Sequence, residues 1–326
     1  MIKLSLKALI KRLKKPQKTL IFCHKNPDPD TLGSAFALKM ILEALGSQVV
    51  ISDCDKPSKK FDFITGGASL TDEFDIDSFE RVIAIDVASP AQLGANVEMA
   101  GKVNLIIDHH ESCTRFADYY EDFAPACAMI VYDIAKGMKL LKRLDLHFFE
   151  CVYAALSGDT GCFKYSNTNP RALEIAADII KRGIDFARIN HDIFDSLTIG
   201  EISAQRMVYD NMAMLLDGRF AIIFVTNEMK ARYGVTDDDI SDIVNTVRQI
   251  QGTLVAVSVK QSSKDNGTFF VSSRANVDID VSRLCASLGG GGHVRAAGAT
   301  ITASSPEEAY ERVKNAFSEG VVKYVP

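Results

Sequence analysis

The sequence predicts an α/β protein with two domains: a doubly wound, mainly parallel sheet comes first, and a helical linker joins it to a smaller α/β domain. In the first half of the chain, apolar runs of strand length alternate with longer helical segments, which is typical of a parallel sheet covered by helices on both faces. The chain has 326 residues, too many for one typical domain and about right for two. We expect the first domain over residues 1–190, the linker over 191–217 and the second domain over 218–326.

The composition is that of an ordinary globular protein, with 47% hydrophobic and 24% charged residues. No apolar run approaches the ~20 residues that a membrane span needs, and the first residues lack the apolar core and cleavage site of a signal peptide. The seven cysteines have no C-x-x-C spacing, which argues against a zinc ribbon or a disulfide framework and indicates reduced thiols. We therefore expect a cytoplasmic protein without a membrane span.

The net charge of −5 gives no general attraction for long duplex nucleic acid. A polyanionic ligand would need a local basic site, which suits a small phosphorylated molecule better than a duplex. Residues 1–18 form a basic amphipathic pattern, for which a surface helix packed on the sheet is the preferred interpretation. A helix that contacts a membrane surface or RNA is the alternative.

A short apolar run at residues 19–23 predicts a buried strand, and His24, Asp28 and Asp30 follow it on a loop with two prolines. The prolines should keep this loop extended and delay any helix until Thr31. The loop would lie at the carboxyl end of a strand, where open α/β sheets bind ligands. Carboxylates with one imidazole suit Mn²⁺ or Mg²⁺, whereas the plain alternative is a polar loop that caps the helix at 32–45.

The same pattern recurs further along the chain. The apolar run 81–85 ends in Asp86, and the run 103–107 ends in Asp108, His109 and His110. Asp159 follows another apolar run, at 152–156. A single acid after a strand is usually a turn residue or a helix cap. Three strands that deliver such residues to the same sheet edge favour a shared site instead.

The remaining elements complete the expected alternation. In the first domain we expect strands at 48–52 and 61–64 and helices at 91–99, 126–141, 146–156 and 170–182. Residues 189–216 contain few helix breakers and predict a helical connection. In the second domain we expect strands at 220–225, 254–260, 268–273 and 298–302, helices at 236–249, 281–288 and 306–318, a hairpin turn at 264–267 and a glycine loop at 289–292.

Four motifs resemble, in their order along the chain, those of the DHH phosphoesterase superfamily. They are His24 with Asp28 and Asp30, Asp86, the triplet Asp108-His109-His110, and Asp159. Near the C-terminus, Gly290-Gly291-Gly292-His293 and the following Ala296-Ala297-Gly298 resemble the DHHA1 substrate-binding domain of this family. The resemblance covers nearly the whole chain. It is nearest to the bacterial nanoRNase/pAp-phosphatase type, whose members are similar in length to this chain.

The resemblance implies two bound Mn²⁺ ions, with Mg²⁺ or Co²⁺ as alternatives. The first ion would be held by His24, Asp28 and Asp86, and the second by Asp30, Asp86, His109 and Asp159, so that Asp86 bridges them. A hydroxide shared by the ions would attack phosphorus in line with the leaving oxygen. Asp108 would orient a histidine, and His110 would face the phosphate.

The resemblance also implies how the substrate is bound. Substrate contacts would come from Arg274, Gly290, Gly291, Gly292, His293 and Arg295. Relatives often carry serine after the arginine, where this chain has Ala275, which puts a hydroxyl contact there in doubt. Arg115 would reach the phosphate or, equally, form a surface salt bridge. A grip across a cleft between the domains would limit substrates to pApA and other linear dinucleotides, RNA of two to five residues, and pAp.

Three other functions are compatible with this chemistry. An inorganic pyrophosphatase would have a lysine-rich second domain in place of the glycine motif, and a single-strand exonuclease of the RecJ kind would usually be larger. A nucleotide sensor without catalysis would have lost some of the metal ligands. The sequence does not rank pAp, pApA, short RNA and cyclic dinucleotide products, and it leaves the oligomeric state open.

Overall fold

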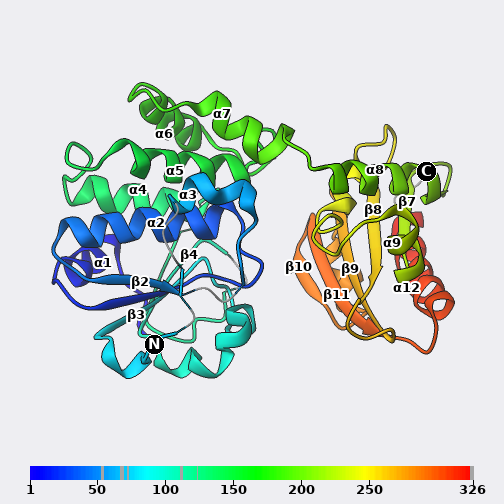
Figure 1. Cartoon of the computed structure of the whole chain (residues 1–326), viewed down its shortest axis with the longest axis horizontal. Helices are drawn as coiled ribbons and strands as arrows, with labels where there is room; N and C mark the ends of the chain where they lie inside the picture. The colour runs from blue at the N-terminus through cyan, green and yellow to red at the C-terminus, as the bar shows by residue number, and fades with distance from the viewer. Residues whose placement is uncertain (53–54, 67–69, 72, 111–112, 123, 324–326) are drawn as a thin grey trace. The chain divides into compact units, whose positions relative to one another are not determined.

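The computed structural model describes residues 1–326 apart from 53–54, 67–69, 72, 111–112, 123 and 324–326. The chain forms two compact units, Met1–Ser196 and Leu197–Pro326, each built around its own sheet (Figure 1). The predicted α/β fold with two sheets is confirmed. Every helix in the described part of the chain is too short or too polar to cross a lipid bilayer.

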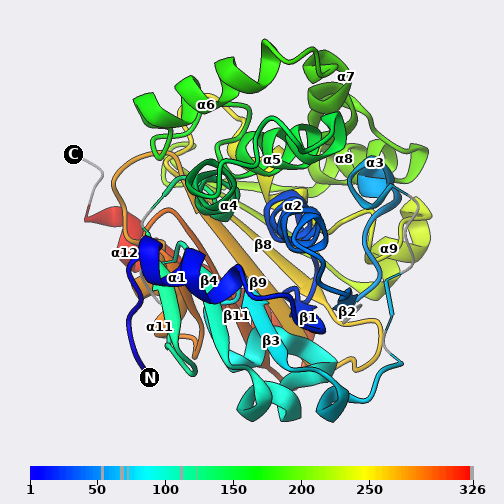
Figure 2. The ribbon, with the colours of Figure 1, turned by 90° about the vertical axis from the view of Figure 1, so that its left-hand side faces the viewer.

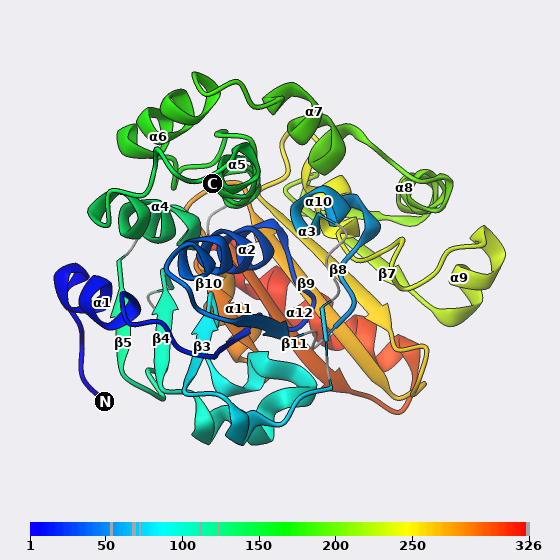
Figure 3. The ribbon, with the colours of Figure 1, turned by 60° about the vertical axis from the view of Figure 1, so that its left-hand side comes forward.

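A five-stranded parallel sheet lies at the centre of the first unit. The strands run in the order β2 (Val49–Ser52), β1 (Thr19–Phe22), β3 (Arg81–Ile85), β4 (Leu105–Asp108) and β5 (Tyr119–Glu121). All neighbours are parallel, and Figure 3 shows β3, β4 and β5 side by side. The sequence did not predict β5. Because the strands run the same way, their carboxyl ends meet at one edge of the sheet.

The two faces of this sheet are covered differently. One face carries α-helices, with α2 and α4 lying over the strands in Figure 2. These helices are α1 (Leu6–Leu13), α2 (Pro29–Ala44), α3 (Asp62–Thr65), α4 (Cys127–Gly137), α5 (Leu146–Asp159), α6 (Pro170–Ile180) and α7 (Phe186–Asn190). On the other face, Phe22, Val82 and Ile106 pack against residues of the 3-10 segment Pro90–Lys102. The sequence predicted helices on both faces of the sheet. In the structure, α-helices cover one face and the 3-10 segment covers the other.

Helices α2 and α5 approach each other unusually closely. A Cβ atom on Gly33 of α2 would lie 2.4 Å from the carbonyl oxygen of Cys151 in α5, so only glycine fits there. At the other end of the contact, Gly158 in the last turn of α5 lies against Pro29 in the first turn of α2. This packing brings the end of α5 to the start of α2, where two of the predicted site residues lie.

Several sequence predictions in the first unit were wrong in detail. Helix α2 begins at Pro29 rather than Thr31, because proline suits the first helical position and Asp28 caps the helix. Residues 61–64 are not a strand: they end a 3-10 turn and begin α3, whose Ile64 is buried among the helices. The expected helix at 91–99 is a 3-10 segment broken at Gly94, where φ is 57°.

The second unit contains a six-stranded mixed sheet. Its order is β10 (Gly291–His293), β11 (Ala296–Thr302), β9 (Thr268–Ala275), β8 (Val255–Gln261), β7 (Phe220–Val225) and β6 (Ala213–Leu215), and only β7 and β8 pair in parallel. The helices are α8 (Ile199–Asn211), α9 (Asn227–Tyr233), α10 (Ile243–Arg248), α11 (Val281–Ala286) and α12 (Pro306–Val322). One face packs on α11 and α12, and the other packs on α8 and α10.

In the second unit one sequence prediction is confirmed and three are corrected by the structure. The hairpin between β8 and β9 is confirmed. The glycine loop is instead an edge strand, because Gly291 and Gly292 pair with β11. The stretch 189–216 is not one helix: a π-helical turn follows α7 and ends at Asp195, α8 begins at Ile199, and residues 213–215 pair with β7 as β6. Within 236–249 only α10 is α-helical, and the residues before it form turns that begin with reciprocal hydrogen bonds between Thr236 and Asp239.

Candidate metal centre

Histidines and carboxylates from distant parts of the sequence lie together at the carboxyl edge of the first sheet. Their ligand atoms form three groups: His24 with Asp28 and Asp86 (the first group), Asp30 with His109 and Asp159 (the second group), and Asp86 with His109 and His110. Within each group all three atoms lie within 4.8 Å of one another. The loop after β1, the start of α2, the ends of β3 and β4, and the last turn of α5 supply them. The resemblance implied the first group in full and the second group with Asp86 as a fourth ligand, and metal binding by these residues stays a prediction.

Asp86 belongs to the first group and also reaches His109 of the second group. Its Oδ2 atom is 3.6 Å from Nε2 of His24, and its Oδ1 atom is 3.3 Å from Nε2 of His109. The residue is 2% exposed and has a φ of 56°, a left-handed conformation that is uncommon for a residue other than glycine. Such strained backbone at a cluster of polar groups is typical of a functional site. One carboxylate oxygen therefore faces His24 of the first group, and the other faces His109 of the second.

The rings of His24 and His109 are held in the same way. Nδ1 of His24 donates to the carbonyl oxygen of Lys25 at 2.8 Å, and Nδ1 of His109 donates to that of Ala124 at 2.9 Å. A carbonyl can only accept, so Nδ1 carries the proton and Nε2 points to the carboxylates. Metal-binding histidines are commonly oriented by such a bond from the second ring nitrogen.

Backbone N–H groups hold the two carboxylates of the first motif. Asp28 caps α2 by accepting from the N–H groups of Asp30 and Thr31 through Oδ1, and its Oδ2 atom lies 3.5 Å from Nε2 of His24. Asp30 accepts from the N–H groups of Cys127 and Ala128 at the start of α4, and from Ser34. Both carboxylates are thus fixed by the backbone while they face the histidines.

The sequence did not reveal the role of α4 in holding Asp30. Helix α4 has Ala126 at its N-cap position, and alanine cannot accept a hydrogen bond there. The unpaired N–H groups of its first turn are satisfied by Asp30 instead. An alanine before an otherwise well-formed helix was the available signal that a distant side chain must supply the cap.

Asp108 holds both histidines that follow it. Its Oδ1 atom accepts from the backbone N–H groups of His109 and His110, and from Nδ1 of His110 at 2.8 Å. The residue is fully buried. Nδ1 of His110 also lies 3.5 Å from Asp86, but its hydrogen bond to Asp108 occupies that nitrogen. Asp108 therefore positions His110 and lies outside all three groups.

The acidic surroundings control protonation at the centre. Burial alone would lower the pKa of His24, but its hydrogen bond to Asp28 and the charges of Asp28 and Asp86 raise it to about 10. Burial of His109 is likewise outweighed by Asp86, Asp30 and Asp159, which raise its pKa. Burial and neighbouring carboxylates raise the pKa of Asp30 to about 7 and also raise that of Asp159. The cluster thus has an excess of negative charge that protons partly neutralise.

The residues fit divalent metal ions on independent grounds. Nε2 of His109 and Oδ1 of Asp86 are buried, and neither has a hydrogen-bond partner among the residues that the structure describes. Buried polar atoms without partners are rare unless a ligand satisfies them. Imidazole nitrogens with carboxylate oxygens form a donor set typical of borderline divalent cations. A cation in the first group and one in the second would take over the role of the protons on His24 and His109.

In the second unit, the strand register aligns two of the predicted substrate residues. Ala296 of β11 pairs with Arg274 on one side and with His293 on the other. Arg274 and His293 therefore lie in one row across three strands and share a face of the sheet. The residues between and beside them are small, since Ala296 has a methyl group and Gly298 has no side chain.

The other predicted substrate residues are placed less closely together. Gly290 lies so near β11 that a Cβ atom would be 2.1 Å from the carbonyl oxygen of Gly298, whereas Gly291 and Gly292 are part of β10. Arg295, between β10 and β11, lies 3.9 Å from Asp278. In the first unit, the guanidinium of Arg115 lies 5.3 Å from the ring centre of Tyr119. Substrate binding by these residues stays a prediction.

Comparison with known proteins identifies the family. Residues 18–156 match the DHH family, N-terminal domain, and residues 217–319 match the DHHA1 domain; together they cover more than half of the chain. The chain belongs to the DHH/DHHA1 family. The predictions of this family and of a phosphoesterase are confirmed.

Curated relatives match almost the full length. The bifunctional oligoribonuclease and PAP phosphatase NrnA of Thermus thermophilus is 28% identical and covers 93% of this chain and 90% of its own. The probable bifunctional oligoribonuclease and PAP phosphatase NrnA of Streptococcus mutans is 27% identical and covers 95% of this chain and 98% of its own. An exopolyphosphatase-related protein from Bacteroides fragilis has a solved structure with a TM-score of 0.87 at 20% identity, covering 98% and 96% of the two chains. The last likeness supports the fold.

Proposed function

We propose that this chain is a phosphohydrolase that requires divalent metal ions and hydrolyses short linear nucleotides. The arrangement that carries the proposal is Asp86, which joins His24 and Asp28 in one group of metal-ligand side chains and reaches His109 of the other. Two relatives are named as oligoribonuclease and PAP phosphatase, which supports the substrate class. Within it we propose pApA and other linear dinucleotides, RNA of two to five residues, and pAp.

Two Mn²⁺ ions are the proposed cofactors. His24, Asp28 and Asp86 would hold one, and a second set that shares Asp86 would hold the other: Asp30, Asp86, His109 and Asp159. The imidazole ligands favour Mn²⁺ over Mg²⁺. When bound, the ions would acidify a water molecule and neutralise charge on the phosphoryl oxygens.

The proposed role of His110 is to donate a proton or hydrogen bond to the phosphate. Burial alone would lower the pKa of His110, but its bond to Asp108 and the charge of Asp86 outweigh burial and raise it. A protonated imidazole can donate to a phosphoryl oxygen or to the leaving oxygen. Asp108 acts as a positioning residue, because it fixes the ring through Nδ1.

Arg274 and His293 are the proposed substrate-binding residues of the second unit. They lie in one row on the same face of the sheet, with the small Ala296 between them. An arginine can bind a terminal phosphate through two parallel hydrogen bonds. Such binding would favour nucleotides with a second phosphate over generic phosphodiesters.

A substrate panel with Mn²⁺ tests the proposal. The panel holds pAp, pApA, RNA of five and of twenty residues, cyclic di-AMP, pyrophosphate and bis-p-nitrophenyl phosphate, assayed with wild type, Arg274→Ala and Arg283→Ala. Arg283 is a matched control, because its side chain is 88% exposed on α11. We expect preference for pApA or short RNA, a KM raised at least tenfold in Arg274→Ala only, and unchanged cleavage of the generic diester.

The alternatives give different results in the same assay. Equal rates on the twenty-residue RNA would indicate a single-strand exonuclease, and pyrophosphate as best substrate would indicate a pyrophosphatase. If metal binds but no substrate is cleaved, the chain is a nucleotide sensor and the proposal fails.

A further inference from the structure

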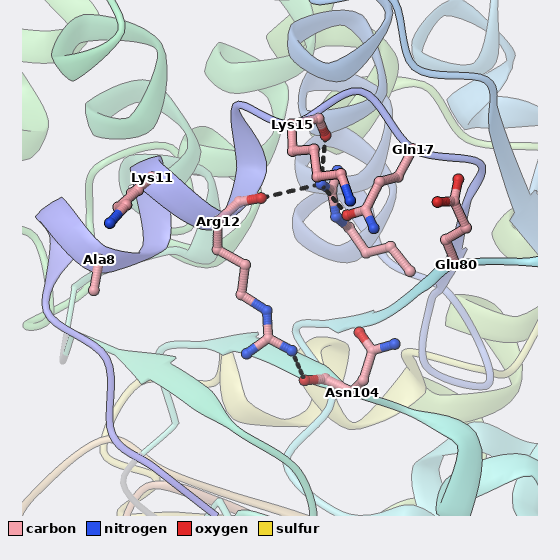
Figure 4. A pocket seen from close by; sticks show the side chains of 8 residues that line it. Ala8, Lys11, Arg12, Lys15, Gln17, Glu80 and Asn104 are labelled. Carbon is pink, nitrogen blue, oxygen red and sulfur yellow. Dashed lines mark hydrogen bonds between the residues drawn. The ribbon is translucent and has the colours of Figure 1, made fainter.

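The amino edge of the first sheet, opposite the metal centre, carries a hollow surrounded by cations. Its cavity has a volume of about 510 Å³, within the range of small-ligand pockets. Figure 4 shows Lys11, Arg12 and Lys15 around it. Arg81, the first residue of β3, also lines it, and Glu80 is the only acidic residue among the described residues of its wall. The basic amphipathic pattern at residues 1–18 thus contributes one wall of a pocket.

Arg81 is a buried cation without an anionic partner. It is 2% exposed, and it forms no ion pair with any residue that the structure describes. One of its terminal nitrogens donates to the carbonyl oxygens of Arg12 and Lys15 at 3.1 and 2.7 Å, and to the side-chain oxygen of Gln17 at 2.7 Å. Nε of Arg81 is buried with no hydrogen-bond partner in the described part of the chain. Buried charges are ordinarily paired, whereas here neutral oxygens bind the guanidinium and, among the described residues, only the charge of nearby Glu80 opposes that of Arg12.

A structural role explains only part of this arrangement. The carbonyls that Arg81 binds lie at and beyond the end of α1, so the guanidinium closes the helix terminus. That role does not require further cations nearby. Yet Arg12 lies close enough that, after burial, it is the next cause that lowers the pKa of Arg81.

The remaining cations differ in how they are paired. Arg12 forms an ion pair with Asp118 at 3.0 Å and donates to the carbonyl oxygen of Asn104. Lys11 and Lys15 are exposed, and no ion pair of theirs occurs within the described residues. The pocket wall therefore combines four cations with Glu80 and has a local positive excess in a chain whose net charge is −5.

We propose that this pocket binds a compact phosphate-bearing anion at a site separate from the metal centre. The phosphoryl group could come from free pyrophosphate or from a nucleotide. No aromatic side chain is among the described residues of the wall, which favours recognition of phosphate over recognition of a base. The lysines and Arg12 would form charge-assisted hydrogen bonds to the phosphate oxygens. Arg81 precedes Asp86 by five strand positions, roughly 16 Å, so the bound phosphate would not reach the reacting group.

Calorimetric titration of the metal-free full chain with pyrophosphate tests the site. At the metal centre, the excess of carboxylates disfavours anion binding in the absence of metal. The test variant is Lys11→Ala with Lys15→Ala, and the matched control is Lys7→Ala with Lys14→Ala. The control residues are exposed lysines of the same segment outside the pocket wall, so both variants lose the same charge. We expect the Kd to rise at least tenfold in the test variant and less than twofold in the control.

Further measurements identify the preferred anion and test whether the pocket takes part in substrate binding. The same variants are titrated with 5′-AMP and with sulfate. Tighter binding of pyrophosphate or 5′-AMP than of sulfate supports the proposal. Absence of pyrophosphate binding, or equal weakening in both variants, would overturn it. A higher KM for pApA with Mn²⁺ in the test variant alone would also overturn it, since the cations would then belong to the substrate path.

Discussion

The two edges of the first sheet carry opposite imbalances of charge. At the carboxyl edge, four carboxylates lie among three histidines, and backbone N–H groups fix Asp28 and Asp30. At the amino edge, Arg81 is buried without a carboxylate, and backbone carbonyls fix it instead. Unpaired buried charge costs stability, so each edge is best explained by a ligand of the opposite sign.

The difference between the edges lies in how rigidly the charges are held. The acidic edge uses short side chains on strand ends and helix starts, which suits ions that demand a fixed geometry. The basic edge surrounds one fixed guanidinium with lysines on flexible stems, which can adapt to anions of different size. A single substitution at the acidic edge should therefore strongly reduce metal binding and turnover. At the basic edge, anion affinity should depend on how many cations line the pocket.

The largest expected effect comes from Asp86→Asn. This change keeps the size of the side chain but removes the charge that faces both His24 and His109. We expect turnover of pApA with saturating Mn²⁺ to fall by at least about 10³-fold, because loss of a shared ligand should impair both metal sites. Steady-state kinetics with metal content measured in parallel checks this.

Glu98→Gln is the control for this variant. Glu98 is an exposed acid of the same unit. Its loss changes the net charge equally and should leave turnover within twofold. An Asp86→Asn protein that binds two metal ions and retains wild-type turnover would contradict the metal-centre assignment.

A smaller effect is expected from pH on metal affinity. In the metal-free protein the pKa of His24 is raised to about 10 and that of Asp30 to about 7, so both hold protons near neutrality. Mn²⁺ must displace those protons, and its affinity should therefore increase as the pH rises. We expect the Kd for Mn²⁺ to fall by about tenfold per pH unit between 6 and 8 for the proton of His24, and more steeply below the Asp30 pKa of about 7.

Titrations in buffers of different ionisation enthalpy measure the affinity and the protons released together. A Kd independent of pH, without proton release, would show that the carboxylates and histidines do not bind the ion.

The smallest effect is expected from Asp159→Asn on the metal-free protein. Burial, followed by the charges of Asp30 and Asp28, raises the pKa of Asp159. A raised carboxyl pKa means that the folding free energy is most favourable below the unfolded pKa near 4 and becomes less favourable as the pH rises towards the folded pKa. Asparagine avoids this cost, so the Tm at pH 7.5 should rise by about 2–4 °C, or about 1 kcal/mol for a unit of this size.

Calorimetry at two pH values and two metal levels tests this prediction. The difference in Tm should shrink as the pH falls towards 4. With saturating Mn²⁺ it should reverse, because the wild type gains stability from metal binding. A lower Tm for the variant in metal-free buffer at pH 7.5 would contradict the inferred repulsion.

The sequence was most informative for residues whose chemistry allows few roles, such as clustered acids and histidines. Acids and histidines after apolar runs predicted a shared cluster, because strand ends in a parallel sheet converge on one edge, and the family resemblance divided its members into two ligand sets. The prediction was weakest for short segments. Residues 61–64 have the composition of a strand but fold as a turn and a short helix, since burial of Ile64 among the helices decides the outcome.

Some features depend on distant contacts that no local pattern contains. The bonds of Asp30 to α4 join residues that are 97 and 98 positions apart, and the close approach at Gly33 depends on where α5 lies. The change of the glycine run from a loop to an edge strand follows from pairing with β11. The pocket at Arg81 likewise requires α1 and β3 to meet.

The sequence alone determined the family, the α/β class and the chemical type of the ligands, because these follow from residue identity, order and hydrophobic pattern. The tertiary structure decided which oxygen or nitrogen faces which partner and where buried charge is left unpaired. Asp86 and Arg81 lie on the same short stretch of chain; the sequence pattern predicted that Asp86 joins other carboxylates, whereas only packing places Arg81 among cations. Such differences arise from contacts between distant segments, whose energies no single segment encodes.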